Sequence, residues 1–273
     1  MTAKDRADPS ILIIGCGNMG GAMLAGWLAG GVDPRTITVV DPVLEAAPEA
    51  VMLLRAVPEG SIHDFVLLGF KPQQLGGVAT GIALAIGAHT TVLSLLAGVE
   101  LATLRAHFGA AGAIVRVMAN LAAAIGKSPI GLVGDGDPST IDRVDALMVP
   151  LGTAEWLADE AQMDLLTALA GSGPAFVYRF IDALAAGAAA LGMERPQADR
   201  LALAMVEGSA ALAAASRDGP GALADRVASP GGVTRKGLDV LDTDRRMVRL
   251  AEDTLRAARD RSAEMARAAR IGE

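Results

Sequence analysis

A glycine-rich stretch near the amino end of the chain, GCGNMG, has the spacing G-x-G-x-x-G. It follows the apolar run ILII and opens a helical pattern, which predicts a strand, a tight turn and a helix. Here Gly15 allows the turn, Gly17 lets the backbone approach a pyrophosphate and Gly20 permits close packing, while the helix start offers free N–H groups. An ordinary glycine-rich turn is the alternative. The predicted cofactor-binding residues of this turn are Gly15, Cys16, Gly17, Asn18, Met19 and Gly20.

An acidic residue ends the next apolar run, TITVVD. Asp41 stands about 20 residues after the glycine motif, where an acid binds the ribose hydroxyls of an adenosine dinucleotide. A 2′-phosphate requires Arg or Lys, and no basic residue follows Asp41 until Arg55, so NADH is at least tolerated. The alternative is that Asp41 caps a turn with Pro42.

Three further apolar runs end in residues that we expect at the same sheet edge as Asp41, because ligands of open α/β sheets bind beyond the carboxyl ends of the strands. The predicted cofactor-binding residues there are Lys71, Pro72, Ala97 and Asn120. The amide of Asn120 offers a donor and an acceptor to a carboxamide or a water molecule. The Lys-Pro pair alone is equally compatible with a simple turn.

The runs that carry these residues alternate with helical patterns in the first part of the chain. This alternation is typical of an α/β fold with a parallel, doubly wound sheet, here of the Rossmann type. The predicted strands cover residues 11–15, 36–41, 65–72, 90–98, 113–120 and 130–134. We therefore expect a dinucleotide-binding domain over residues 1–158.

Residues 159–273 have a different character. Clusters of β-branched residues almost disappear, and Ala- and Leu-rich helical patterns follow over residues 174–191, 196–217, 234–241 and 243–270. A small Ala-rich bundle has a limited core of its own, so we expect an all-helical substrate-binding and dimerisation domain that packs against a second copy of itself. A monomeric bundle is the alternative.

The composition argues against several classes of protein. The net charge of −7 disfavours a general attraction to nucleic acid or to a membrane surface. The longest apolar helical run, residues 181–193, is shorter than the roughly 20 residues of a membrane helix and contains Asp182. A single cysteine, Cys16, and the polar N-terminal stretch MTAKDRADPS, which lacks the apolar region of a secretory signal, favour a cytoplasmic protein.

The usual catalytic nucleophiles and metal ligands have no suitable partners in the sequence. The three histidines, His63, His89 and His107, lack metal-ligand spacing, so we expect no metal and predict exposed helix or loop positions for them. There is no G-x-S-x-G motif, and nothing places a base beside Cys16. Reduction of an already protonated imine fits these absences, because orientation against a nicotinamide then supplies most of the catalysis.

The motifs together resemble those of the pyrroline-5-carboxylate reductase family over nearly the whole chain. The resemblance rests on GCGNMG, KP at a strand end, SLLAGV, VRVMAN, AGSGPAFVYRFIDAL and above all SPGGVT. It implies NADPH- or NADH-dependent reduction of 1-pyrroline-5-carboxylate to L-proline, the last step of proline biosynthesis. It also implies an N-terminal Rossmann domain and a C-terminal helical domain that interlocks with a partner subunit, in a homodimer or a ring of dimers.

The same resemblance implies a substrate site in SPGGVT. The amides of Gly231, Gly232 and Val233 would lie free at a helix start and bind the substrate carboxylate, where a Cβ on glycine would block the approach. Thr234 matches the family threonine whose hydroxyl contacts the ring nitrogen, which gives it the catalytic role. Glu160 matches an acid common in the family, and we expect it to be a solvated acid at a helix start.

Some positions differ from the family pattern. The stretch MANLAA, residues 118–123, stands where the family commonly has MPNTPA, and GFKP stands where AVKP is common. Two alternatives therefore accompany proline synthesis. One is a related Rossmann reductase of another cyclic imine, and the other is a nucleotide-binding protein without turnover.

Overall fold

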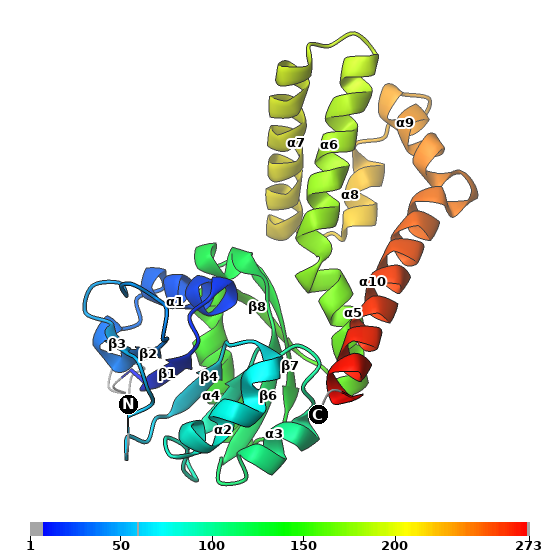
Figure 1. The fold of residues 1–273 in the computed structure, drawn as a ribbon. Coiled ribbons are helices and arrows are strands. Elements are labelled where there is room, and N and C mark those ends of the chain that lie inside the picture. Colours follow the sequence, from blue (N-terminus) through cyan, green and yellow to red (C-terminus); the bar gives the residue numbers. More distant parts are fainter. Residues whose placement is uncertain (1–7, 59, 272–273) are drawn as a thin grey trace. The chain divides into compact units, whose positions relative to one another are not determined.

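The apolar runs of the first half of the chain form one sheet in the computed structural model, which describes residues 8–58 and 60–271 (Figure 1). The strand order is β3-β2-β1-β4-β5-β6-β7-β8. The strands of this sheet are β1 (Ile11–Ile14), β2 (Ile37–Val40), β3 (Met52–Leu54), β4 (Phe65–Leu68), β5 (Thr91–Ser94), β6 (Ala113–Met118), β7 (Ser128–Gly134) and β8 (Gly152–Trp156).

The sheet is doubly wound. Strands β1 and β4 are neighbours and the chain runs outward from them in both directions, so the order reverses between them. Successive side chains of each strand face opposite sides. One side, with Ile13 and Val39, packs against α1 and α4, and the other, with Leu12 and Val66, packs against α2 and α3. The predicted Rossmann-type α/β class is therefore confirmed.

Two details of the sheet differ from the sequence prediction. Strand β7 pairs antiparallel with β6, and β8 runs parallel to β7, so the last two strands oppose the other six. Strands β3 and β8 were not predicted. Both lie at edges of the sheet and include exposed residues, so neither shows the continuous apolar run of a central strand.

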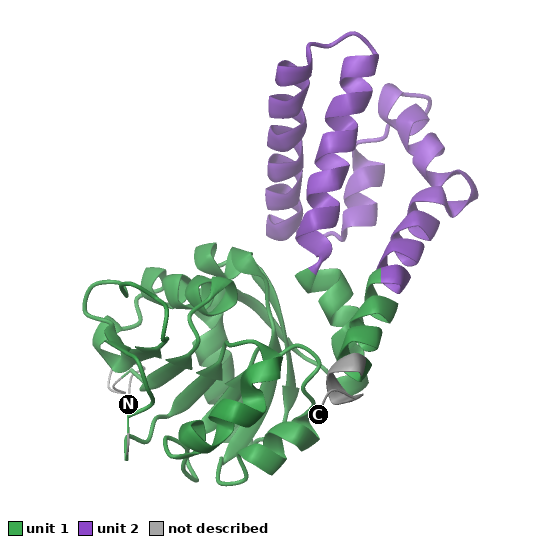
Figure 2. Ribbon diagram, in the orientation of Figure 1, with its two compact units in different colours: residues 1–171, 258–273 green, residues 172–257 purple. Residues whose placement is uncertain are grey.

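The helices divide between two compact units (Figure 2). Unit 1 comprises residues 1–171 and 258–273, and unit 2 comprises residues 172–257, so α10 contributes residues to both. The helices of unit 1 are α1 (Asn18–Ala29), α2 (Leu75–Ala83), α3 (Leu101–His107), α4 (Pro138–Met148) and α5 (Met163–Leu166). The remaining helices are α6 (Gly173–Ala190), α7 (Arg195–Ala215), α8 (Pro220–Arg226), α9 (Val233–Asp242) and α10 (Arg246–Ile271).

The predicted boundary after residue 158 follows the change in composition, whereas unit 1 also includes residues 159–171. Most of the N-terminal stretch MTAKDRADPS lies outside the described residues. Within residues 8–58 and 60–271, no helix combines the length and the apolar character needed to cross a membrane.

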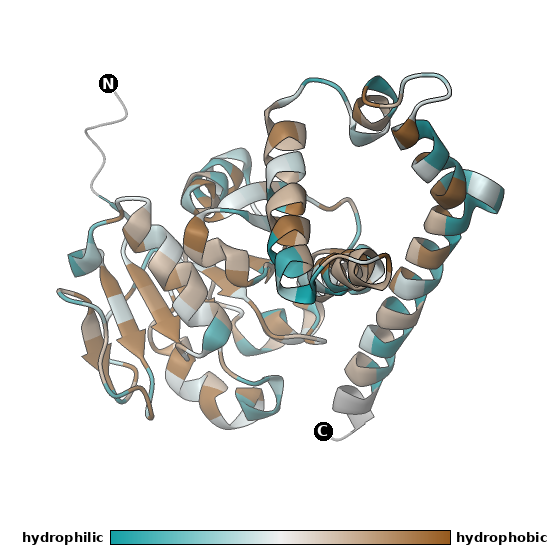
Figure 3. Cartoon of the chain, turned by 90° about the horizontal axis from the view of Figure 1, so that it is seen from above, coloured by the Kyte–Doolittle hydropathy of each residue, from teal (hydrophilic) through white to brown (hydrophobic). Residues whose placement is uncertain are grey.

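Unit 2 buries little apolar surface by itself. Its buried cluster consists of Ala185, Ala198 and Ala202, where α6 packs against α7. Figure 3 shows hydrophobic residues on the helices of unit 2 as well as on the strands of unit 1. Large apolar side chains that stay exposed in unit 2 include Val177, Tyr178, Phe180, Leu201, Leu203, Met205, Leu212, Val240, Val248 and Leu250.

His63 is buried just before β4, so the prediction that it is exposed is wrong, whereas His89 and His107 are exposed as predicted. The Nε2 of His63 lies 2.9 Å from Ser61 Oγ, and the Nδ1 of His63 has no hydrogen-bond partner among the described residues. Burial lowers the pKa of His63, and the charge of Asp64 opposes this only in part. The native state therefore holds a neutral imidazole at neutral pH.

We expect the free energy of unfolding to fall as the pH drops below about 6.5, the ordinary pKa of histidine. Between that value and the lowered native pKa of His63, the unfolded chain binds a proton that the native state does not, so stability rises with pH there. Replacing His63 with Leu should reduce this dependence in urea unfolding between about pH 5 and about pH 7. His89→Gln is the control, and a His63 variant with the parent's full pH dependence would contradict the assignment.

Candidate functional site

The turn between β1 and α1 can be built only with glycine at two of its positions. Gly15 has a φ of +84°, and a Cβ there would lie 2.9 Å from the backbone N of Phe70. A Cβ on Gly20 would lie 2.6 Å from the carbonyl oxygen of Gly15. A Cβ on Gly17, the N-cap of α1, would meet no atom within 4 Å. The chain therefore makes a tight turn whose backbone at Gly17 borders open space.

This turn fits the pyrophosphate of a dinucleotide. No side chain caps α1 and no acid stands in its first turn, so the N–H groups at the helix start keep their hydrogen-bonding capacity. Those N–H groups and the helix dipole favour an anion. Burial raises the pKa of the Cys16 thiol, and the charge of Asp41 adds to this, so Cys16 is a small neutral side chain in the turn. Contacts of these residues with a cofactor stay a prediction.

Asp41 directly follows β2 and is 7% exposed. Its Oδ2 accepts the N–H of Cys16 at 2.8 Å, and its Oδ1 accepts the N–H groups of Val43 and Leu44, each at 2.9 Å. Burial alone would raise the pKa of Asp41, but these three hydrogen bonds and the nearby Arg55 outweigh it and hold the pKa below its ordinary value. Asp41 is therefore an anion that caps the turn after β2 and also links it to the glycine turn.

Arg55 lies at this edge as well, and the sequence analysis did not include it in the site. It directly follows β3, which pairs in parallel with β2, so both strands end at the same edge of the sheet. Its Nη1 donates to the carbonyl oxygens of Asp41 at 2.8 Å and Leu44 at 2.6 Å. Because β3 was not recognised as a strand, nothing in the sequence analysis placed Arg55 beside Asp41.

Lys71, Pro72 and Ala97 follow β4 and β5, at the same carboxyl edge as Gly15. Lys71 precedes the helical turn Pro72–Gln74, and its backbone N–H donates to Gln74 Oε1 at 3.1 Å. Its side chain is exposed, and its ammonium forms no ion pair within the described part of the chain. The position of these residues suits a ligand at the sheet edge, and the contact itself stays a prediction.

Asn120 follows β6 and is buried, and its side chain is held by the protein. Its Oδ1 accepts the N–H of Ala122 and its Nδ2 donates to the carbonyl oxygen of Ala170, both at 2.9 Å. Asn120 thereby caps the short helical turn Leu121–Ile125, which is how MANLAA folds in this chain. The amide keeps one donor and one acceptor position for a ligand, rather than its full capacity.

Glu160 is not the solvated acid that we predicted. Its Oε1 accepts from Arg116 Nη1 at 2.6 Å and from the N–H of Leu101 at 2.8 Å, and Arg116 is buried in β6. Glu160 therefore joins β6 to the first turn of α3, just after the loop that carries Ala97. The ion pair helps to explain why residues 159–171 belong to unit 1.

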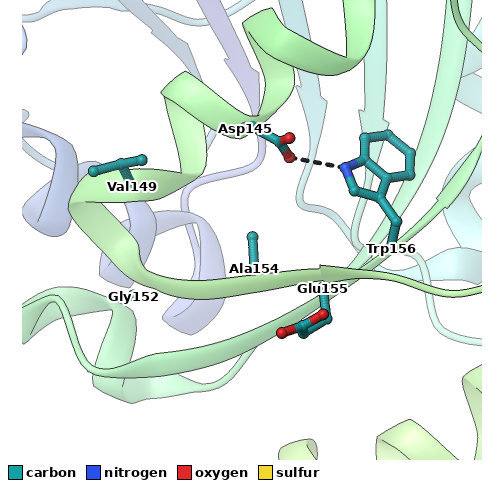
Figure 4. Close-up of a pocket in the computed structure, with 6 residues that line it drawn as sticks. All are labelled: Asp145, Val149, Gly152, Ala154, Glu155 and Trp156. Atoms are coloured by element: carbon teal, nitrogen blue, oxygen red, sulfur yellow. Dashed lines mark hydrogen bonds between the residues drawn. The ribbon is translucent and has the colours of Figure 1, made fainter. Parts of the chain in front are cut away.

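A hollow beside β8 lies at the opposite end of the strand order from β2 and β3 (Figure 4). Its lining residues are Asp145, Val149, Gly152, Ala154, Glu155 and Trp156. Figure 4 shows Asp145 and Trp156 pointing toward one another, and the indole Nε1 donates to Asp145 Oδ1 at 2.8 Å. The polar groups that point toward one another are thus already paired. Within the described residues, no three His, Cys, Asp or Glu side chains are grouped to hold a metal ion.

In unit 2, SPGGVT forms the turn before α9. Gly231 has a φ of +69°, and Gly232 is the N-cap of α9 without a side-chain cap. The N–H of Gly232 donates to the carbonyl oxygen of Ser229 at 2.9 Å, so the prediction that its amide is free is wrong, because closure of the turn uses it. Among the described residues, the N–H groups of Gly231 and Val233 have no acceptor outside the helix, and Thr234 is exposed.

A doubly wound sheet with a G-x-G-x-x-G turn at its carboxyl edge and an acid after β2 defines a dinucleotide-binding protein of the Rossmann class. In agreement, residues 10–98 match a family described as NADP oxidoreductase, coenzyme F420-dependent. Residues 160–265 match a family described as pyrroline-5-carboxylate reductase dimerisation.

Individual relatives extend these matches to the whole chain. The chain is 34% identical to pyrroline-5-carboxylate reductase of Pseudomonas aeruginosa over 266 residues, which are 94% of this chain and 97% of the relative. It is 33% identical to the Escherichia coli protein of that name, over 86% of this chain and 90% of the relative. A solved pyrroline-5-carboxylate reductase from Coxiella burnetii has a TM-score of 0.87 at 29% identity, covering 94% and 98% of the two chains. This chain belongs to the pyrroline-5-carboxylate reductase family.

Replacing Glu160 with Ala should lower the free energy of unfolding by about 2 kcal/mol, because it leaves the buried Arg116 guanidinium unpaired. The expected loss is below that for a fully buried pair, since the Glu160 side chain is 29% exposed. Urea unfolding measures it, with Glu155→Ala on β8 as the control for loss of an exposed acid. Equal losses in the two variants would show that the ion pair does not stabilise unit 1.

Proposed function

We propose that this chain reduces 1-pyrroline-5-carboxylate to L-proline with NADPH or NADH, as the last step of proline biosynthesis. The observation that carries the proposal is the 34% identity to the Pseudomonas aeruginosa pyrroline-5-carboxylate reductase over 94% of this chain. The glycine turn of unit 1 and the SPGGVT turn of unit 2 supply a site for each reactant. A Plasmodium falciparum pyrroline carboxylate reductase solved with NADP bound shares the fold, with a TM-score of 0.79.

The bound nicotinamide supplies the hydride for this reaction. The chain holds the dinucleotide through the N–H groups of the turn around Gly17 and through Asp41, Lys71, Pro72, Ala97 and Asn120 at the carboxyl edge of the sheet. These residues position the cofactor and exclude other orientations. The carbon of a protonated imine is electrophilic without further activation, so positioning supplies most of the rate enhancement.

In unit 2 the free N–H groups of Gly231 and Val233, at the positive end of the α9 dipole, bind the substrate carboxylate. The hydroxyl of Thr234 accepts the N–H of the protonated imine, orients the ring and keeps a hydrogen bond to the amine that forms. Arg235 fixes this helix start, because it pairs with Asp225 of α8 at 3.3 Å and with Asp242 at 2.8 Å.

Unit 2 is proposed to form a homodimer, and dimers to assemble into a ring. The buried core of unit 2 consists of three alanines, while large apolar side chains of its helices stay exposed. A second copy that covers these side chains would provide the missing core. The family description that matches residues 160–265 names dimerisation. A cytoplasmic location completes the proposal, since the chain has one cysteine and needs no disulfide.

Replacing Thr234 with Ala should lower kcat/KM by roughly 10- to 100-fold, the scale of one lost, well-positioned hydrogen bond. The assay follows oxidation of NADPH and NADH with 1-pyrroline-5-carboxylate and identifies proline as the product. Thr254→Ala is the matched control, because its hydroxyl bonds to the carbonyl oxygen of Leu250 within α10. A Thr234 variant as fast as the parent refutes the role of Thr234.

The same assay separates the proposed activity from the two alternatives. Turnover of 1-pyrroline-5-carboxylate supports proline synthesis. Turnover only of other cyclic imines supports a related reductase, and nucleotide binding without any turnover supports a non-catalytic protein.

Replacing Leu201 with Glu should shift the chain from dimer to monomer, because it places a charge among exposed apolar side chains of α7. Leu201 is 52% exposed in the single chain. Sedimentation velocity measures the mass, with Leu84→Glu in unit 1, 57% exposed, as the matched control. If the Leu201 variant keeps the parent's mass, α7 does not form the interface.

A further inference from the structure

Two residues with oppositely charged side chains follow β2 and β3 at the same edge of the sheet. Asp41 follows β2 and Arg55 follows β3, and Nη1 of Arg55 donates to the carbonyl oxygen of Asp41 at 2.8 Å. In Rossmann folds this edge meets the adenosine ribose: an acid there binds the 2′-hydroxyl, and an arginine nearby accommodates a 2′-phosphate. This chain has both groups.

The Asp41 carboxylate has one acceptor position that forms no hydrogen bond with the described residues. A carboxylate has about four acceptor positions. Oδ1 uses two for the N–H groups of Val43 and Leu44, and Oδ2 uses one for Cys16, so one position remains on Oδ2. A 2′-hydroxyl can donate a hydrogen bond to it, whereas a 2′-phosphate is an anion and is repelled by the carboxylate.

Arg55 supplies the opposing positive charge. Its side chain is exposed, and within the described part of the chain its Nε and Nη2 groups donate no hydrogen bond, since Nη1 alone binds the protein. The planar guanidinium suits a phosphate, which it can bind through two parallel hydrogen bonds. Residues 42–54 contain no other Lys or Arg, so Arg55 is the cation that this part of the chain offers.

We propose that Asp41 and Arg55 together set the choice between NADH and NADPH, with Asp41 favouring the nucleotide that has a 2′-hydroxyl and Arg55 the one that has a 2′-phosphate. Because the two charges act in opposite directions at one place, the native chain binds both nucleotides with affinities within about tenfold of each other. This inference rests on the proposed function in one respect: it requires a dinucleotide to bind in unit 1.

The test is titration calorimetry of the full-length chain with NAD⁺ and with NADP⁺, without substrate. Arg55→Gln should weaken NADP⁺ relative to NAD⁺ by about tenfold, the scale of one lost hydrogen bond between charged groups. Asp41→Asn should move the ratio of the two Kd values in the opposite direction, because it removes the repulsion of the 2′-phosphate. The ratio is the readout, since Asn also loses an acceptor for the N–H of Cys16 and so weakens both nucleotides.

Arg35→Gln is the matched control. Arg35 is an exposed arginine that precedes β2, at the opposite end of the strand, and it pairs with Asp33. The ratio should stay at the parent's value in this variant. Added salt should weaken NADP⁺ more than NAD⁺ in the parent, and this difference should disappear in Arg55→Gln, because salt screens the charge–charge contact.

The inference is overturned if Arg55→Gln and Asp41→Asn change both Kd values by the same factor, or if both move the ratio in the same direction. Failure of the parent chain to bind either nucleotide is a different outcome, and it contradicts the proposed function instead.

Discussion

Backbone N–H groups at the start of a helix have no acceptor inside the helix, and we propose that two helix starts of this chain use them to bind ligands. In helix α4 a side chain satisfies one of them, because the N-cap Asp137 accepts the N–H of Thr140. Helices α1 and α9 have glycine caps, Gly17 and Gly232, and like most of the described helices they have no side-chain cap. Each also follows a turn with a positive-φ glycine, Gly15 before α1 and Gly231 before α9. Both functions proposed for these turns, holding a dinucleotide in unit 1 and a small carboxylate in unit 2, depend on these donors.

Charged side chains hold the backbone around these helix starts in place. In unit 1, Asp41 accepts the N–H of Cys16 in the glycine turn before α1. In unit 2, Arg235 pairs with acids of α8 and α9. The Asp41 carboxylate accepts the N–H groups of Cys16, Val43 and Leu44, so it leaves the N–H groups at the start of α1 available to a ligand.

Signals that are local in sequence were enough to predict much of the fold and the outline of the site. The glycines of GCGNMG and SPGGVT favour tight turns whatever lies elsewhere in the chain. Alternating strand and helix patterns favour one sheet. Features that depend on distant residues could not be predicted this way. Glu160 forms an ion pair with Arg116, which lies 44 residues earlier in the sequence. Arg55 bonds to the carbonyl oxygen of Asp41 only because β3 pairs with β2. The burial of His63 and the bond from Gly232 to Ser229 likewise follow from packing and turn closure rather than from periodicity.

The most direct test of the open helix starts is an experimental structure of the chain with L-proline bound. Because the N–H groups of Gly231 and Val233 are proposed to bind the substrate carboxylate, we expect the proline carboxylate about 2.7–3.2 Å from these two backbone nitrogens. A carboxylate bound elsewhere, with both amides hydrogen-bonded to protein, would contradict the account.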